Sequence, residues 1–112
     1  MPLFKRIATA DVNAVSLKAT AGRLYLLVAS NLTASAKFVK LYNKTSAPTV
    51  GTDVPVLTFP VQANQTVTLY SDSPDGGLPF SAGVAFAMTG AVGDADATAL
   101  AAGDMVINGR YE

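Results

Sequence analysis

The residues best able to do chemistry are carboxylates near the end of the sequence. Asp94 and Asp96 are separated by one residue, and Asp104 follows them. Carboxylate oxygens at close spacing can bind calcium, but this segment is too short for an EF-hand and lacks the required later glycine and glutamate. A helix cap and a solvated loop explain these aspartates better than a metal site does.

A second acidic group, Asp72 and Asp75, lies beside the glycine pair Gly76-Gly77. The same interpretation, a solvated loop, applies to these two carboxylates. The glycine pair is not a phosphate-binding loop, because the pattern GxxxxGK[ST] is absent and no strong helix follows it. We therefore expect neither a metal ion nor a cofactor.

Catalysis by side chains is equally poorly supported. The chain contains no histidine and no cysteine, which removes the commonest general base and the thiolate nucleophile. Serine and threonine are plentiful, but only a lysine or a carboxylate could activate them. No paired carboxylates share a strand face beside an obvious cleft. The prediction is that the protein is not an enzyme and has no catalytic residues.

The composition suits a protein that acts by contact. Half of the 112 residues are apolar, 14% are charged, and eight basic and eight acidic residues cancel. A net charge of zero gives little resistance to self-association, and dispersed basic residues argue against a nucleic-acid partner. No apolar run approaches the roughly 20 residues that span a bilayer. We expect neither a nucleic acid nor a membrane as partner, and no secretory signal is recognisable at residues 1–15.

The hydrophobic pattern predicts one all-β domain over residues 1–112. Its centre, RLYLLVASNLTASAKFVKLYNK at 23–44, is predicted to be a hairpin of strands 23–30 and 36–43 joined by a polar turn. Further strands are predicted at 13–18, 54–61, 66–70, 81–89 and 104–111. Strands that recur without long helices favour an antiparallel β-sandwich of jelly-roll or Greek-key type. An open barrel of five or six strands is the alternative.

Two segments between and after these strands have their own predictions. Residues 71–79, SDSPDGGLP, form the strongest turn cluster and are predicted to be a tip loop. Residues 94–102, DADATALAA, are predicted to form the one short helix, because alanine is the best helix former and an aspartate could cap its start. Such a helix has about two turns and is marginal alone.

Two strands indicate what must cover the sheets. Strand 23–30 is apolar at consecutive positions, so both of its faces need cover, either from this chain or from a partner. In strand 81–89, Gly83, Ala85 and Ala87 share one face. A face of small residues lets another backbone or sheet approach closely.

Five residues are candidate interface anchors. Leu3, Phe4 and Ile7 lie within residues 1–10, which could form an edge strand or an N-terminal arm that docks on a neighbouring subunit. Tyr70 and Phe80 flank the glycine-rich tip loop, where exposed aromatic side chains can anchor an interface. Ordinary packing at the base of the loop is the alternative for both aromatics.

Two long stretches of the chain are similar to a known group of proteins. Residues 18–61, KATAGRLYLLVASNLTASAKFVKLYNKTSAPTVGTDVPVLTFPV, and residues 91–109, AVGDADATALAAGDMVING, resemble small structural proteins of tailed bacteriophages. Together they cover more than half of the chain, whereas residues 71–80 match less well. The similarity is one of overall sequence and not of a catalytic motif.

The resemblance implies a virion structural protein, made in the host cytoplasm and located on the capsid surface. Proteins of this kind include capsid decoration (cement) proteins, some of them jelly rolls, which bridge and stabilise capsid subunits. The implied partners are the major capsid protein and further copies of the chain, as a dimer or trimer. The alternative is a tail- or neck-associated structural protein or a receptor- or carbohydrate-binding module. The absence of tryptophan and the scattered amides weaken the carbohydrate-binding alternative.

Overall fold

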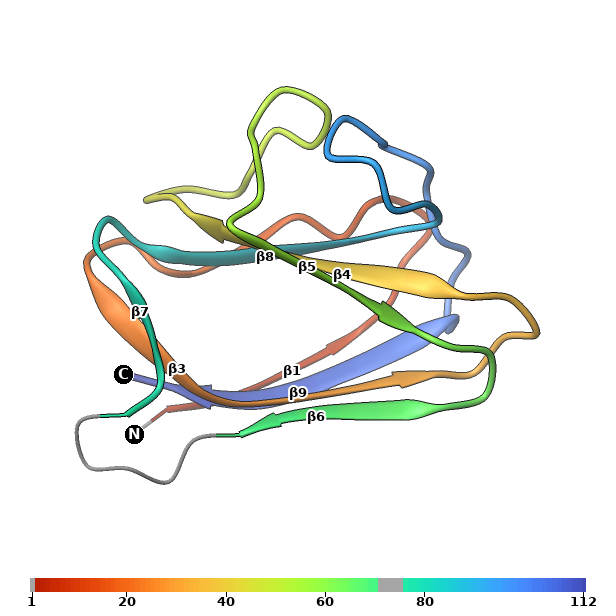
Figure 1. The fold of residues 1–112 in the computed structure, drawn as a ribbon, viewed down its shortest axis with the longest axis horizontal. Helices are drawn as coiled ribbons and strands as arrows, with labels where there is room; N and C mark the ends of the chain where they lie inside the picture. The colour runs from red at the N-terminus through yellow and green to blue at the C-terminus, as the bar shows by residue number, and fades with distance from the viewer. Residues whose placement is uncertain (1, 71–75) are drawn as a thin grey trace.

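The computed structural model describes residues 2–70 and 76–112, and in these residues it contains strands and no helix. The strands are β1 (Leu3–Ile7), β2 (Val15–Lys18), β3 (Gly22–Asn31), β4 (Lys37–Asn43), β5 (Leu57–Val61), β6 (Thr66–Tyr70), β7 (Leu78–Phe80), β8 (Val84–Thr89) and β9 (Met105–Tyr111). They form two antiparallel sheets packed face to face (Figure 1). The predicted all-β sandwich is confirmed.

The strand order is that of a jelly roll. One sheet has the order β1-β9-β3-β6, with the short β7 also paired to β3, and the other has the order β2-β8-β4-β5. With β7 set aside, the first strand pairs with the last, the second with the next to last, and so on to the β4–β5 pair. The chain is therefore one long antiparallel ribbon rolled into two sheets.

The predicted hairpin of residues 23–44 is wrong. Both strands exist, but β3 belongs to the first sheet and β4 to the second, so the polar segment between them crosses from sheet to sheet. The buried Asn31 holds this crossing, because its Nδ2 donates to the carbonyl oxygens of Ser35 and Val61, both at 2.8 Å. Its Oδ1 accepts from the backbone N–H of Thr33 at 2.9 Å.

The predicted helix at 94–102 is also wrong. The Asp96 carboxylate accepts hydrogen bonds from the backbone N–H groups of Ala91 and Thr98 and from the Thr98 hydroxyl. These local bonds compete with helical ones. The N–H of Leu100 instead donates to the Asp11 carbonyl, which places the Leu100 side chain in the core. A marginal helix thus loses to side-chain and tertiary bonds.

The core lies between the two sheets. Leu27, Ala29 and Ile107 enter it from the first sheet, and Leu41 and Phe86 enter from the second, all of them buried. Alternate residues along each strand point inward, as expected for a pleated strand with one face on the core. The residues that alternate with these inward-pointing ones form the two outer faces of the sandwich.

The outer face of the β2-β8-β4-β5 sheet is covered by the chain itself. Residues 44–56 and 90–104, the β4–β5 and β8–β9 connections, arch over this sheet in Figure 1. Beneath them Tyr42, Ala85 and Ala87 form a second buried cluster. The predicted approach of another backbone to the small face of strand 81–89 therefore takes place, and loops of the same chain provide it.

The tip loop divides between described and undescribed residues. Residues 71–75 lie outside the described part of the chain, so the structure does not bear on that part of the prediction. Residues 78–80 form β7, a strand that the sequence analysis missed because Pro79 and the preceding glycines resemble a loop. Proline is tolerated in β7 because this short strand pairs only with the start of β3.

Candidate interaction surface

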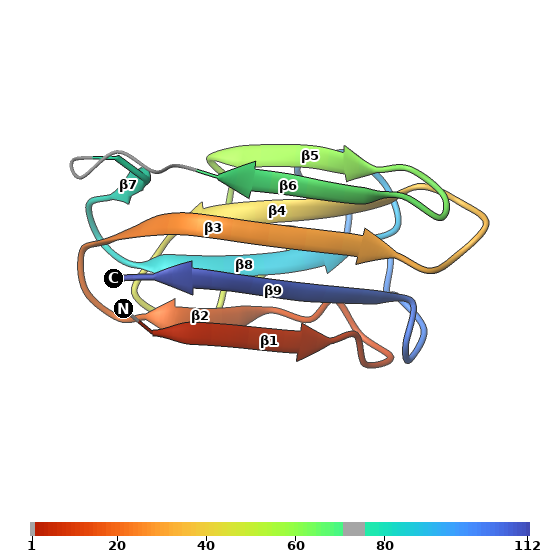
Figure 2. The same cartoon turned by 90° about the horizontal axis from the view of Figure 1, so that it is seen from below.

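The outer face of the β1-β9-β3-β6 sheet is left open by the described residues. Seen from below in Figure 2, these four strands lie in front of the other sheet, and no described segment crosses them. Their outward side chains fall into three cross-strand rows, which we call the open face: Leu3, Arg110, Leu26 and Tyr70; Lys5, Asn108, Val28 and Thr68; Ile7, Val106, Ser30 and Thr66.

Large apolar side chains are exposed at the borders of the open face. Leu3 is 79% exposed and Ile7 56% on β1, and Tyr70 is 60% exposed on β6. Between them, Leu26 and Val28 of β3 are only half-buried. The sequence indicated that strand β3 needs cover on both faces. Its alternate residues Leu27 and Ala29 pack in the core, whereas Leu26 and Val28 face outward. Such a patch on a sheet is typical of a protein–protein contact.

A shallow pocket occupies one corner of the open face. Its volume is about 380 Å³, and its lining residues are Leu3, Phe4, Lys5, Leu26, Asn108 and Gly109. Gly109 leaves room for the Phe4 ring on the core side of the sheet, because a Cβ atom there would overlap that ring and the Leu26 carbonyl oxygen. The lining is mostly apolar, so the pocket can accept an apolar side chain of a partner.

The charge on the open face is of one sign. Lys5 and Arg110 lie in its rows, and no carboxylate does, among the residues described. The Nε of Arg110 is buried and has no hydrogen-bond partner in the described chain. Arg110 lies between Leu3 and Leu26 in the register. Arg110 thus lies between two apolar residues in its row, and its Nε makes no use of its hydrogen-bonding capacity in the described chain.

The five candidate anchors separate into two groups. Leu3, Ile7 and Tyr70 lie on the open face, where they are available to a partner. Phe4 instead points inward, with its ring centroid 5.8 Å from that of Phe86, and Phe80 is only 2% exposed. The anchors left to a partner are therefore the first three, because the other two are committed to the core of this chain.

Residues 1–10 are not a free arm in this structure. Residues 3–7 are strand β1, which pairs with β9 along its whole length. Ala8 then enters the core and donates its N–H to the Met105 carbonyl oxygen. The sequence left open an edge strand or a docking arm for this segment, and in the structure it is an edge strand. Its outward edge, with the backbone groups of Leu3, Lys5 and Ile7, carries no further strand in the described chain.

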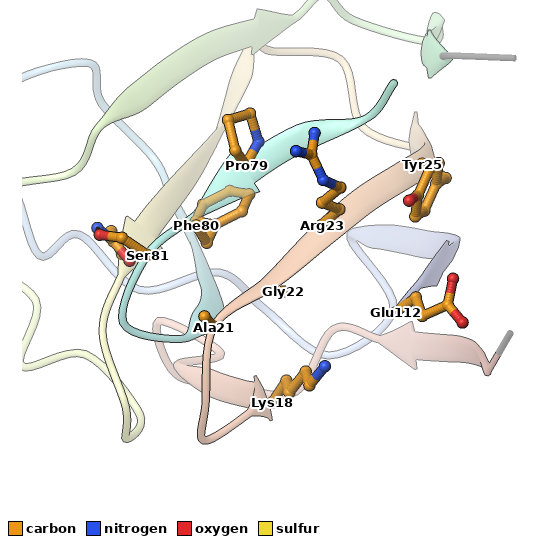
Figure 3. A pocket seen from close by; sticks show the side chains of 10 residues that line it. Lys18, Ala21, Gly22, Arg23, Tyr25, Pro79, Phe80, Ser81 and Glu112 are labelled. Carbon is orange, nitrogen blue, oxygen red and sulfur yellow. The ribbon is translucent and has the colours of Figure 1, made fainter. Parts of the chain in front are cut away.

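A pocket of about 570 Å³ lies at one end of the sandwich (Figure 3). Lys18, Arg23 and Glu112 bring charges of both signs to it. Ser81 also lines it, but its hydroxyl accepts a hydrogen bond from the Asn43 amide, which is not a base. In this pocket the Ser81 hydroxyl is therefore not activated by its hydrogen-bond partner.

Two of the carboxylates considered as metal ligands, Asp96 and Asp104, make bonds in the layer of loops 44–56 and 90–104, which we call the loop layer. Asp96 bonds Thr98 and Ala91, which lowers the pKa of the Asp96 carboxyl below its ordinary 3.8. Asp104 accepts from the N–H of Ala101 and pairs with Lys37. No cluster of three or more possible metal ligands occurs in residues 2–70 and 76–112. Within the same residues, no helix is long and apolar enough to cross a membrane.

Lys40 fastens the loop layer from below. It lies on the outer face of β4, is wholly buried, and its Nζ donates to the carbonyl oxygens of Gly93 at 2.6 Å and Asp96 at 3.1 Å. Burial lowers the pKa of the Lys40 ammonium below its ordinary 10.5, and the carboxylates of Asp96 and Asp94 partly oppose this. Lys40 has a structural role here and is not accessible to a substrate.

Sequence reasoning missed the residues that complete the open face, above all Arg110, Leu26 and Val28. Alternation along 104–111 does place Arg110 opposite the core residues of that strand. The neighbours of Arg110 follow only from its pairing with β1 and β3, which the sequence does not reveal. Comparison of the chain with family models, with curated proteins and with solved structures finds no match to any of them.

Proposed function

We propose that this chain is a structural protein of a tailed-bacteriophage virion and that it decorates and cements the capsid. It binds the major capsid protein through the open face and bridges neighbouring subunits without catalysing a reaction. The support from sequence is the similarity of residues 18–61 and 91–109 to small phage structural proteins. The support from structure is a small jelly roll, an architecture used by viral capsid domains and also by lectins.

The observation that carries this proposal is the asymmetry of the sandwich. One outer face is closed by loops 44–56 and 90–104, and the other presents Leu3, Leu26 and Val28 to the outside. A monomer with no partner gains nothing from an open sheet with apolar rows, because such a patch favours aggregation. A protein that is buried against a shell gains contact area from it.

Quantitative mass spectrometry of purified virions tests the proposal. We expect a fixed ratio to the major capsid protein, near one copy per capsid subunit or a simple fraction, because shell sites repeat with the symmetry. A ratio far lower would place the protein at the neck or tail instead. Absence from virions would contradict the proposal as a whole.

A pair of matched variants tests whether the open face makes the contact. Leu3→Ser removes an exposed leucine from the open face, and Leu32→Ser removes one that is 64% exposed in the crossing between the sheets. We expect only Leu3→Ser to weaken binding to shells that lack the protein. Equal binding of both variants and the unchanged chain would refute this role for the open face.

A further inference from the structure

We infer that the partner of the open face presents a carboxylate beside an apolar side chain, and that Arg110 is the residue that recognises this carboxylate. The inference rests on the proposed function, since the partner would be the shell protein, and it adds the chemistry of the contact. Four observations carry it: the sign of the charges, the condition of Arg110, the adjoining pocket and the location of this chain's own acidic groups.

The cations of the open face have no counter-charge within it. Lys5 and Arg110 lie in adjacent rows, and the nearest described acidic residue along β9 is Glu112. The backbone of Glu112 pairs with Arg23 beyond the first row, at the end of the sheet. A partner covering the three rows would therefore remove two cations from water. Such burial is costly unless the partner supplies opposite charge.

Arg110 is the better placed of the two cations for specific recognition. Its Nε is shielded by its surroundings and makes no hydrogen bond in the described chain. A buried donor without a partner costs stability, and a turn of the Arg110 side chain that brings Nε to a partner's acceptor would recover this cost. A carboxylate fits best, because the guanidinium offers two parallel N–H groups in a rigid fork. Lys5 is more exposed and provides a less directional attraction.

The adjoining pocket specifies the apolar part of the partner. Leu3, Lys5 and Leu26 line it, and Leu3 and Leu26 are also the register neighbours of Arg110. A partner side chain in the pocket would thus lie next to the row that contains Arg110. A volume of about 380 Å³ accommodates a leucine or phenylalanine side chain. The matching surface is an apolar residue with an aspartate or glutamate next to it.

A second copy of this chain is a poorer match than a carboxylate-bearing partner. Two open faces brought together would bury four cations, Lys5 and Arg110 of each copy, in one interface with no carboxylate in the rows of either. Like charges placed together across an interface are unfavourable. Pairing through the free edge of β1 has the same difficulty, since Lys5 is at the centre of that strand.

The test is co-sedimentation of purified protein with capsid shells that lack it, using Arg110→Gln, Arg110→Lys and Lys5→Gln. Lys18→Gln is the control, because it removes the same charge as Lys5→Gln from β2 in the other sheet. We expect Arg110→Gln to weaken shell binding by about tenfold or more, which corresponds to 1.4 kcal/mol. Arg110→Lys should restore only part of this loss, and Lys5→Gln should weaken binding less and mainly at low salt. Lys18→Gln should bind normally.

Three results would overturn the inference. Equal shell binding by Arg110→Gln and the unchanged chain would refute the role of Arg110 and leave the proposed function standing. Sedimentation velocity could instead show that the unchanged chain forms dimers and that Arg110→Gln is monomeric. This result would show that a second copy covers the open face. Failure of the unchanged chain to bind shells at all would contradict the proposed function, and the inference with it. Unfolding curves of each variant would show that lost binding is not lost folding.

Discussion

Replacing Asn31 by alanine should destabilise the whole sandwich, although Asn31 lies in a connection and not in the apolar core. Its side chain makes four hydrogen bonds, two as donor to the carbonyl oxygens of Ser35 and Val61 and two as acceptor from Thr33. The bond to Val61 ties the end of β3 in one sheet to the end of β5 in the other. Asn31 is only 1% exposed, so water does not replace it freely.

The size of the effect follows from which groups water can reach after the substitution. The groups of Thr33 and Ser35 are partly exposed and can be hydrated. The Val61 carbonyl belongs to a buried residue and would lose its side-chain partner. Loss of the side-chain bond to this buried carbonyl together with loss of the other hydrogen bonds of Asn31 gives about 2–4 kcal/mol. Asn31→Asp should cost more, because the carboxylate cannot donate to the two carbonyls and is buried as a charge.

Urea unfolding followed by far-ultraviolet circular dichroism measures this difference, and the chain has no tryptophan to follow instead. Asn108→Ala is the matched control, since Asn108 is exposed on β9 in the same sheet, and it should stay within about 0.5 kcal/mol. The reasoning is refuted if Asn31→Ala is no more destabilising than the control. It is also refuted if Asn31→Asp is the milder of the two changes, because donation by the amide would then be unimportant.

Two further predictions concern the layer of loops over the second sheet. Lys40→Met should lower the free energy of unfolding by about 1–3 kcal/mol and speed amide exchange in residues 91–98, because it leaves two carbonyls unpartnered. Burial lowers the pKa of Lys40, so the folded state binds fewer protons than the unfolded chain just below pH 10.5. The unchanged chain should therefore gain stability over Lys40→Met as pH rises toward 10.5, and a constant difference would contradict this. Tyr42→Phe should be neutral or stabilise the fold, since the Tyr42 hydroxyl is buried without a hydrogen-bond partner in the described chain. A clear loss of stability in thermal unfolding would show that the hydroxyl has a partner.

Alternation of apolar residues was sufficient to locate most strands. For residues 66–70 the predicted and observed bounds coincide, because Val67 and Leu69 alternate with threonines without interruption. The partners of each strand could not be predicted in the same way. In a jelly roll the pairs β1–β9 and β2–β8 join opposite ends of the chain. No local pattern records such pairs, so the sequence supported a sandwich but left its order open.

The two wrong predictions have the same physical origin. Asn31, Thr33 and the serine after them do form a turn, but their side chains serve equally well in a crossing between sheets. Residues 94–102 have helical propensity, yet Asp96 and Lys40 bond their backbone groups in another conformation. In both cases a polar side chain with a distant or competing partner outweighed a local preference.

The candidate interface could be predicted only in part, because on a strand a single position decides between core and surface. Leu3 and Phe4 are neighbours with similar hydrophobicity, but only Leu3 is exposed, since the pleat turns Phe4 toward Phe86. Tyr70 is exposed for the same reason, and Phe80 is not, because β7 closes the end of the core. Which phase each strand adopts depends on its neighbours in the sheet.

The difference between the two outer faces follows from side-chain size. On β8, Ala85 and Ala87 leave room for loops to lie close to the sheet, and Lys40 of the neighbouring β4 supplies the donors that the loop carbonyls need. On β3, Leu26 and Val28 project too far for a backbone to pack against the strand, and they offer no donors to one. A surface that brings its own apolar side chains covers such a face best, which agrees with the partner protein proposed above.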